Sequence, residues 1–368
     1  MRVVVLGATG TIGKMSLDVV NSLKDFELVG VSANTSEDDL LKIKRKFPNV
    51  KTALSGVQSD EVDFYGQDAV ERLLQATSPD YVVVGVSGFI GLKYSLIASK
   101  VAKRLCLANK ESIVTGGNFF LKKVKENGCE IIPVDSEHSA VFQLLDGEKS
   151  RVKKIILTAS GGALRDVPLS ALKTVTPKEV LKHPVWKMGA RITVDSATMF
   201  NKGLEVMEAK FLFGFEAEKI GVIVHPQGKI HAMIEFEDGT FKMHVSRADM
   251  RIPISYALNY PHRVNIFEPF TPLGDMSLAE PDLKRYPALK LAYDALKAGD
   301  GARIVYNAAD EVAVDAFLKG KICFTNIYEV VKDVLQKEWP EFLNDYEEIE
   351  KVDFEAREMT KEMIKRWC

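Results

Sequence analysis

The first third of the chain alternates short, β-branched apolar runs with segments of helical periodicity, and this alternation restricts the fold more than any other feature of the sequence. We expect strands at 2–6, 27–32, 52–54, 81–86, 104–108 and 130–134. We expect helices at 12–23, 36–46, 67–76, 89–101 and 111–127. Apolar strands that alternate with helices indicate a parallel sheet covered on both faces. Such sheets bind ligands at the carboxyl ends of their strands.

The rest of the chain has a different pattern. Strands are expected at 154–158, 191–194, 221–225, 229–235 and 240–245, with a hairpin turn at Asp238-Gly239. Helices are expected at 201–215, 286–297, 303–318, 325–337 and 350–366. Residues 261–286 are rich in proline and lack periodicity, which is typical of a linker. The middle third is therefore interpreted as α+β and the last as a small α-helical bundle.

Length and composition restrict the class of protein. A chain of 368 residues suggests two or three domains, and 46% hydrophobic with 27% charged residues is typical of a soluble globular enzyme. The formal net charge of −2 gives no reason to expect a nucleic-acid partner. No apolar stretch is long enough to span a bilayer, so no membrane association is expected. The cysteines Cys106, Cys129, Cys323 and Cys368 form no CxxC element, which favours a reduced, cytoplasmic chain.

A glycine-rich loop, Gly7-Ala8-Thr9-Gly10-Thr11-Ile12-Gly13, follows the first expected strand and precedes a helix. Glycine allows a close backbone approach to a pyrophosphate, and the free N–H groups of the following helix attract that anion. We therefore predict a Rossmann-like, dinucleotide-binding domain, although a tight turn without ligand has the same pattern. The second strand is followed by no acidic residue before Glu37, which favours NADP over NAD.

Three carboxylates are candidates for a divalent metal. Asp135 and Glu137 directly follow the last strand of the expected sheet, and Glu205 lies one turn into the helix expected at 201–215. Hard cations such as Mg²⁺ and Mn²⁺ take oxygen ligands of this kind. The alternatives are a helix cap at Asp135-Ser136 and a surface ion pair between Lys202 and Glu205.

Further polar residues suggest a phosphate site. Asn201 and Lys202 share a helix face with Glu205, and Ser160 lies in a glycine loop that could form an anion nest or a simple turn. The segment 183–189 contains His183, Trp186 and Gly189, a composition that fits either a lid over substrate or a packed surface loop.

Lys110 follows the fifth expected strand in the sequence Asn109-Lys110-Glu111, at the same ligand-binding edge. There it could reach a carbonyl or a hydroxyl of a substrate. The alternative is a helix that begins here with Asn109 as its cap.

Motifs along nearly the whole chain resemble, in order, those of the 1-deoxy-D-xylulose 5-phosphate reductoisomerase family. The matching segments are 7–13, 108–112, 133–140, 160–162, 183–189, 195–205, 225–227, 249–253 and 307–311. One segment departs from the pattern: the family usually has Gly, a basic residue and Asn after the second strand, where this chain has Ala33-Asn34-Thr35-Ser36. That departure concerns the contacts of the NADPH 2′-phosphate.

The resemblance implies an enzyme of the non-mevalonate isoprenoid route. It would use NADPH and Mg²⁺ or Mn²⁺ to rearrange and reduce 1-deoxy-D-xylulose 5-phosphate, a small phosphorylated ketose, to 2-C-methyl-D-erythritol 4-phosphate. It also implies a homodimer. The implied domains are an NADPH-binding domain at 1–146, a catalytic metal and substrate domain at 147–260, a linker at 261–286 and a helical bundle at 287–368.

The resemblance also assigns roles to residues. Metal ligands would be Asp135, Glu137 and Glu205. Substrate contacts would come from Lys110, Ser136, Ser160, His183, Ser196, Asn201 and Lys202, with Ser160, Ser196, Asn201 and Lys202 on the phosphate. The NADPH site would be lined by Thr9, Gly10, Thr11, Ile12, Asn109, Glu111 and Gly189.

Two other functions fit parts of the pattern. A metal-independent NAD(P) dehydrogenase acting on a semialdehyde would work in EDTA and would not need Glu205. A non-catalytic redox sensor would bind NADPH without consuming it. The carboxylates argue against the sensor, because paired carboxylates without a metal repel each other.

Overall fold

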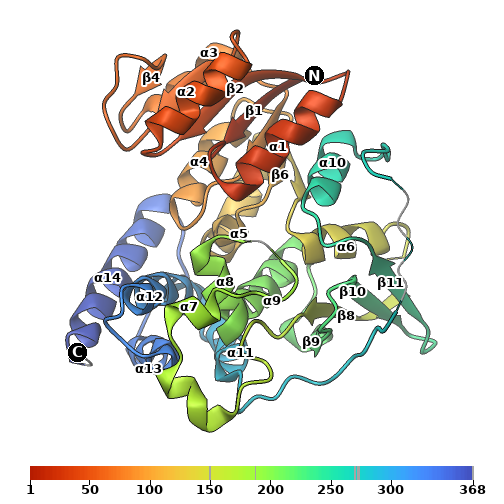
Figure 1. Ribbon diagram of the computed structural model, residues 1–368, viewed down its shortest axis with the longest axis vertical. Helices are drawn as coiled ribbons and strands as arrows, with labels where there is room; N and C mark the ends of the chain where they lie inside the picture. The colour runs from red at the N-terminus through yellow and green to blue at the C-terminus, as the bar shows by residue number, and fades with distance from the viewer. Residues whose placement is uncertain (149–150, 187, 269–270, 272–273, 367–368) are drawn as a thin grey trace. The chain divides into compact units, whose positions relative to one another are not determined.

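A seven-stranded parallel sheet is the framework of the N-terminal part of this computed structural model (Figure 1). The structure describes residues 1–148, 151–186, 188–268, 271 and 274–366, so Lys187 and Cys368 lie outside the described residues. The strands are β1 (Arg2–Leu6), β2 (Glu27–Ala33), β3 (Lys51–Leu54), β4 (Phe64–Tyr65), β5 (Tyr81–Val84), β6 (Arg104–Leu107) and β7 (Glu130–Pro133). The predicted parallel sheet is confirmed, and the two-residue strand β4 is the one strand of it that was not expected.

The sheet order is β4-β3-β2-β1-β5-β6-β7, so the chain runs outward from β1 first to one side and then, from β5, to the other. Loops after neighbouring strands diverge at such a reversal and leave room for a ligand. The helices that follow the strands are α1 (Thr11–Ser22), α2 (Glu37–Lys46), α3 (Ala69–Thr77), α4 (Ile90–Ser99), α5 (Lys110–Glu126) and α6 (Ser136–Leu144). The glycine loop thus lies at the reversal, between β1 and α1.

The chain divides into two compact units that interleave along the sequence. The first contains Met1–Ser112, Phe120–Ser139 and Asp249–Pro269, and the second contains Ile113–Phe119, Ala140–Ala248 and Phe270–Cys368. Helix α10 (Arg251–Asn259) belongs to the first unit, because the buried guanidinium of Arg104 donates to the carbonyls of Ala257 at 3.1 Å and Leu258 at 3.2 Å. The four-part domain division expected from the sequence remains a prediction.

The second unit contains a four-stranded sheet of order β11-β10-β8-β9. Its strands are β8 (Val152–Ala159), β9 (Ile220–Val224), β10 (Ile230–Phe236) and β11 (Phe241–Val245). Strands β8 and β9 are parallel, while β10 pairs antiparallel with both β8 and β11. The predicted hairpin is confirmed, with Gly239 at a φ of +83° between β10 and β11. One face of this sheet packs on α9 (Phe200–Phe213) through residues such as Ile155, Ile234 and Val206.

The strand expected at 191–194 is wrong, because these residues lie in helix α8 (Ala190–Thr198). Four residues of alternating polar and apolar character fit a strand as well as one turn of helix. In the structure Thr193, Val194, Asp195 and Ala197 are all buried, so most of α8 after its first turn is enclosed by other elements. Tertiary packing has therefore overridden the β-propensity of this segment.

The C-terminal helices match the sequence-based expectation. They are α11 (Pro287–Ala298), α12 (Asp300–Leu318), α13 (Phe324–Leu335) and α14 (Tyr346–Ile364). Helix α12 is buried along most of its length and packs on α11, α13 and α14, as Figure 1 shows. It begins three residues earlier than expected, directly after Gly299, whose φ of +110° separates it from α11.

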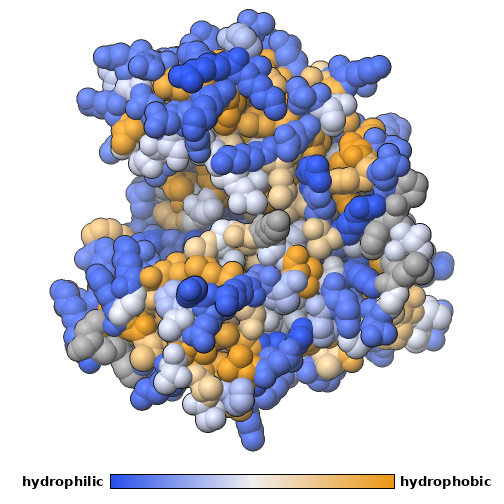
Figure 2. All heavy atoms as spheres, in the orientation of Figure 1, coloured by the Kyte–Doolittle hydropathy of each residue, from blue (hydrophilic) through white to orange (hydrophobic). Residues whose placement is uncertain are grey.

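Charged side chains cover the outer elements of the first unit. Figure 2 shows hydrophilic side chains over α2 and α3. The basic residues Lys44, Arg45 and Lys46 form the last turn of α2, and Lys44 pairs with Asp63 at 3.1 Å. Within the described residues, no helix combines the length and the apolar character that crossing a membrane requires.

Candidate active site

The glycine loop is shaped by close backbone contacts at Gly7 and Gly13, where a side chain would not fit. A Cβ on Gly7, whose φ is +77°, would lie 2.8 Å from the carbonyl oxygen of Gly85, and a Cβ on Gly13 would lie 2.5 Å from the Cα of Ala8. Gly10 is the N-cap of α1 and supplies no side-chain bond to the first amide groups of that helix. The backbone N–H groups at Thr11 and Ile12 therefore stand at a helix N-terminus that suits an anion.

The turn after β2 has an acidic neighbour. Helix α2 begins with Glu37, Asp38 and Asp39, and Asp39 pairs with Lys42 at 2.8 Å and with Lys14 at 3.8 Å. Hydrogen bonding and Coulomb attraction from Lys42, helped by Lys14, lower the pKa of Asp39. The ammonium groups of Lys14 and Lys42 are thus both paired with the Asp39 carboxylate.

Asn109 organises the turn after β6 from a fully buried position. Its amide nitrogen donates to the carbonyls of Val86 and Gly88, each at 3.1 Å, and to Glu111 at 2.9 Å. Its side-chain oxygen accepts from the Ser112 amide at 2.8 Å, which caps α5. The cap predicted as the alternative is thus present, and it holds Asn109 and Glu111 in one rigid turn.

Lys110 and Asp135 form a buried ion pair in the first unit. The Lys110 ammonium lies 2.6 Å from the Asp135 carboxylate, and the His138 ring lies 3.5 Å from the same oxygen. Burial would raise the pKa of Asp135, but the Lys110 ammonium and His138 outweigh it and hold the pKa below its ordinary value. Asp135 is therefore an ionised carboxylate beside Glu137, which accepts a hydrogen bond from the Ser136 hydroxyl.

Glu205 is buried on α9 in the second unit. It is 1% exposed, and it accepts hydrogen bonds from the Lys202 ammonium and from the Asn201 amide. The surface ion pair considered as an alternative is wrong, because Lys202 is only 4% exposed. A Cβ on Gly203 would collide with the hydroxyl of Tyr306, so α9 packs directly on α12 at this residue. A buried pair of this kind costs desolvation energy and is weak evidence for stability alone.

His183 joins two serines in the second unit. Its Nε2 lies 3.0 Å from the Ser160 hydroxyl and 3.2 Å from the Ser196 hydroxyl. Its Nδ1 accepts from the backbone amides of Val185 at 3.2 Å and Trp186 at 2.8 Å. Because Nδ1 accepts, the proton of the neutral ring is on Nε2 and points at the serines. Burial lowers the pKa of His183, which favours this neutral form.

The glycine loop at Ser160 packs closely on α8. A Cβ on Gly162, whose φ is +69°, would lie 2.5 Å from the Cα of Ala197. The Gly162 amide donates to the Ser160 hydroxyl at 3.2 Å. Ser160 and Ser196 are therefore held together by backbone packing, and the expected anion nest has two hydroxyls and an imidazole N–H around it.

Comparison with known proteins identifies the family. Models of the 1-deoxy-D-xylulose 5-phosphate reductoisomerase match residues 3–117, and models of its C-terminal domains match residues 131–213 and 245–359. The reductoisomerase of Thermotoga maritima is 46% identical over 96% of this chain and 94% of its own length. The chain belongs to the 1-deoxy-D-xylulose 5-phosphate reductoisomerase family.

Other members of the reductoisomerase family agree over the full length. The protein of Geobacter metallireducens is 41% identical over 99% of both chains. A reductoisomerase structure described as a complex with NADPH, fosmidomycin and magnesium has a TM-score of 0.91 at 33% identity, covering 99% of this chain and 98% of that chain. The Zymomonas mobilis reductoisomerase in complex with NADPH has a TM-score of 0.87 at 36% identity, with the same coverage.

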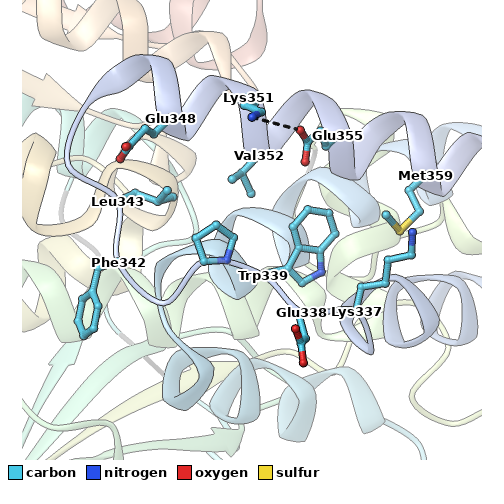
Figure 3. Close-up of a pocket in the computed structure, with 11 residues that line it drawn as sticks. Lys337, Glu338, Trp339, Phe342, Leu343, Glu348, Lys351, Val352, Glu355 and Met359 are labelled. Atoms are coloured by element: carbon cyan, nitrogen blue, oxygen red, sulfur yellow. Dashed lines mark ion pairs between the residues drawn. The ribbon is translucent and has the colours of Figure 1, made fainter.

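The candidate residues of this family member fall in both compact units. The glycine loop, Asn109–Glu111 and Asp135–Glu137 belong to the first, while Ser160, His183, Ser196 and the α9 residues belong to the second. Gly189 is the N-cap of α8. A cavity of about 460 Å³ elsewhere, between residues 337–343 and α14 (Figure 3), is lined by residues such as Trp339, Val352 and Met359. Its described lining contains none of the candidate residues.

Sequence reasoning missed a buried acidic cluster. The segment 307–311 was part of the resemblance, yet no role was assigned to Asp310 or Glu311. In the structure Asp310 is fully buried on α12, and Arg191 of α8 pairs with Glu311 at 3.0 Å. The available signal was the pair of adjacent acids among the apolar residues in the middle of this helix, since buried acids need partners.

Proposed function

We propose that the protein converts 1-deoxy-D-xylulose 5-phosphate to 2-C-methyl-D-erythritol 4-phosphate, by a rearrangement and a reduction that use NADPH and Mg²⁺ or Mn²⁺. The observation that carries this proposal is the 46% identity with a named reductoisomerase over 96% of the chain. Solved relatives described as complexes with NADPH and with magnesium support the choice of cofactors.

The metal would be held by Asp135, Glu137 and Glu205. The donor set fits, because all three supply carboxylate oxygens, the ligands that Mg²⁺ and Mn²⁺ prefer. The Lys110 ammonium keeps Asp135 ionised, and the hydrogen bonds from Lys202 and Asn201 orient Glu205. When bound, the metal supplies Lewis-acid stabilisation of oxygens that gain negative charge.

The substrate phosphate would bind to Ser160, Ser196, Asn201 and Lys202. Two hydroxyls, an amide and an ammonium are hydrogen-bond donors for phosphate oxygens. The His183 Nε2–H, held in place by the Val185 and Trp186 amides, faces the two serines and would complete this clamp. The clamp would act away from the reacting carbons, where binding energy can orient the rest of the substrate.

The first unit would supply the remaining contacts to substrate and NADPH, except for Gly189 of the second unit. Lys110 would donate from its ammonium to the substrate hydroxyls, and Ser136 would add a hydroxyl beside it. The pyrophosphate of NADPH would lie on the loop residues Thr9, Gly10, Thr11 and Ile12. Asn109, Glu111 and Gly189 would line the rest of the NADPH site, with Asn109 and Glu111 fixed in their buried turn.

The direct test is the absorbance of NADPH in the presence of 1-deoxy-D-xylulose 5-phosphate, with Mn²⁺ or with EDTA. We expect NADPH to be consumed only when both substrate and metal are present. Consumption in EDTA would favour the metal-independent dehydrogenase, and binding of NADPH without consumption would favour the sensor. The cytoplasmic location expected from the sequence remains a prediction.

We also propose that the protein is a homodimer that associates through β11. This strand is last in the order of its sheet, and the alternate residues Phe241, Met243 and Val245 are exposed. An exposed apolar edge strand is a pairing surface unless something covers it. A second copy fits best, because two β11 strands related by a two-fold axis would run antiparallel, as β10 and β11 do.

A further inference from the structure

A buried cluster of charged groups connects α8 to the C-terminal helices. We call it the α12 acid cluster, and its residues are Arg191 and Asp195 of α8, Asp310 and Glu311 of α12, and Asp353 and Arg357 of α14. Arg191 lies 3.0 Å from Glu311 and 3.6 Å from Asp195. Arg357 lies 2.8 Å from Glu311 and 2.6 Å from Asp353. The whole cluster lies within the second unit.

The charges of the cluster do not balance if every acid is ionised. The cluster has four carboxylates and two guanidinium groups, which leaves an excess of two negative charges in a largely buried region. Burial raises the pKa of Glu311, but the guanidinium groups of Arg191 and Arg357 both attract its carboxylate. The two guanidinium groups outweigh burial and lower this pKa. An uncompensated buried charge is strongly destabilising, because it has lost its hydration without gaining a partner. A bound proton removes part of this cost.

Asp310 is the acid most in need of that proton. It is fully buried. Among the described residues, no group donates a hydrogen bond to either of its carboxylate oxygens when Asp310 and Asp195 are both ionised. The side chain that interacts with it most strongly is the carboxyl of Asp195. Two ionised carboxylates are acceptors only, so they repel each other, whereas one protonated carboxyl donates to the other. Burial, followed by the charge of Asp195, raises the pKa of Asp310 well above its ordinary value.

We propose that Asp310 is a protonated carboxylic acid that donates a hydrogen bond to Asp195 and thereby positions Ser196 for the substrate phosphate. Asp310 is a positioning residue: it acts through Asp195, which precedes Ser196 on α8. The proposal rests on the phosphate role of Ser196 under the proposed function. A shift of α8 would also disturb Ser160, because the Gly162 backbone packs against Ala197.

The shared proton predicts a pH dependence with a definite sign. The groups that face Asp310 are Asp195 and Arg191 from α8, and Tyr306 and Glu311 from α12 itself. Because the folded-state pKa of Asp310 is raised, the folded protein keeps a proton that the unfolded chain releases above about pH 4. Stability from this proton is complete below the unfolded pKa and is lost as the pH rises toward the folded pKa.

The test compares Asp310→Asn with Asp310→Ala in the full-length enzyme. Asparagine keeps a hydrogen-bond donor for Asp195, so we expect KM for the phosphorylated ketose within about twofold of wild type. Alanine removes the carboxylic-acid donor that Asp310 offers to Asp195, and we expect KM to rise about tenfold or more, because small misplacements of binding groups have large effects. Asp315→Asn, an exposed position on the same helix, is the matched control and should change neither KM nor Tm.

The second readout is Tm measured from pH 5 to about pH 8, across the window between the unfolded and raised pKa values. The fall in Tm with rising pH should be smaller for Asp310→Asn than for wild type, because the amide has no proton to lose. If the two slopes are equal, or if Asp310→Asn raises KM as much as Asp310→Ala, the shared proton is excluded. The comparison of the Tm slopes of Asp310→Asn and wild type tests the shared proton even if Asp310→Ala fails to fold.

Ser196→Ala separates this inference from the proposed function. A raised KM in Ser196→Ala supports the phosphate role of Ser196. If Ser196→Ala leaves KM unchanged, the phosphate assignment fails, and with it the positioning role of Asp310, whatever the Tm slopes show. If Ser196→Ala raises KM but Asp310→Ala does not, only the inference about Asp310 is wrong.

Discussion

At the residue scale, the proposed chemistry of this protein involves two buried ion pairs. Lys110 and Asp135 form a buried pair in one unit, and Lys202 and Glu205 form another in the second. Such pairs are expensive to bury, and hydrophobic replacements often stabilise a protein more. Their retention in this chain is better explained by a demand for charge at the site than by stability. The sequence indicated which residues carry charge, but it could not indicate that Lys202 is buried.

We expect Glu205→Gln to bind NADPH as the wild type does and to lose metal-dependent turnover. The amide removes one of the three proposed carboxylate ligands, and it also leaves the buried Lys202 ammonium without its anionic partner. NADPH titration and steady-state kinetics with Mn²⁺ would measure the two effects separately. Glu216→Gln, which changes an exposed carboxylate after α9, is the control. Full turnover in Glu205→Gln would exclude the three-carboxylate site.

At the element scale, packing determines the conformation of each loop. The turn before α1 exists because Gly7 and Gly13 allow backbone atoms to approach where a Cβ would collide. The segment before α8 is organised around His183, which accepts from two backbone amides. The pattern of glycines predicted the first loop. The segment around His183 was ambiguous in the sequence, because hydrogen bonds to a histidine ring produce no periodic pattern of residues.

Gly13→Ala should damage the glycine loop. The added methyl would meet the Ala8 Cα at 2.5 Å, and overpacking of this kind costs about 1–3 kcal/mol. We expect a lower Tm and weaker NADPH binding, measured by thermal unfolding and by fluorescence titration. In Gly10→Ala the nearest atom would be 3.4 Å from the new Cβ, so its Tm should stay close to wild type. Equal Tm values for all three proteins would contradict the steric argument.

His183→Ala and Trp186→Ala should both raise KM and slow turnover. The first removes the Nε2–H that faces Ser160 and Ser196, and the second removes the bulk of the proposed lid. Steady-state kinetics would measure both effects, with Lys182→Ala as an exposed neighbouring control. The lid interpretation would not survive wild-type kinetics in both variants.

At the scale of the whole molecule, two interleaved units supply one set of candidate residues. The chain leaves the first unit and later returns to it with α10. There, backbone carbonyls of α10 accept hydrogen bonds from the Arg104 side chain. From the sequence, no helix was expected at 251–259 and these residues were included in the middle domain, whereas the structure has α10 there. The sequence of a helix does not show which of its backbone carbonyl groups will accept hydrogen bonds from a buried arginine elsewhere in the chain.

Met243→Glu should dissociate the proposed homodimer. A charge on the apolar face of β11 would have to be buried against a second copy, which is costly without a partner. Sedimentation velocity should show a monomer for Met243→Glu and a dimer for the wild type. Lys242→Gln, on the opposite face of the same strand, should leave the dimer intact. A wild-type monomer at all accessible concentrations would contradict the proposal.

Local pattern alone was sufficient for the parallel sheet, the glycine loop, the hairpin at Gly239 and the four C-terminal helices, because periodicity and turn chemistry are properties of neighbouring residues. Resemblance to a family was sufficient for the choice of candidate residues. Tertiary structure decided that 191–194 is helical, that Glu205 and Lys202 are buried, which nitrogen of His183 carries the proton, and that Asp310 faces Asp195. Each of these depends on partners far away in the chain, since burial and hydrogen bonding are set by what packs against a residue and not by its neighbours in sequence.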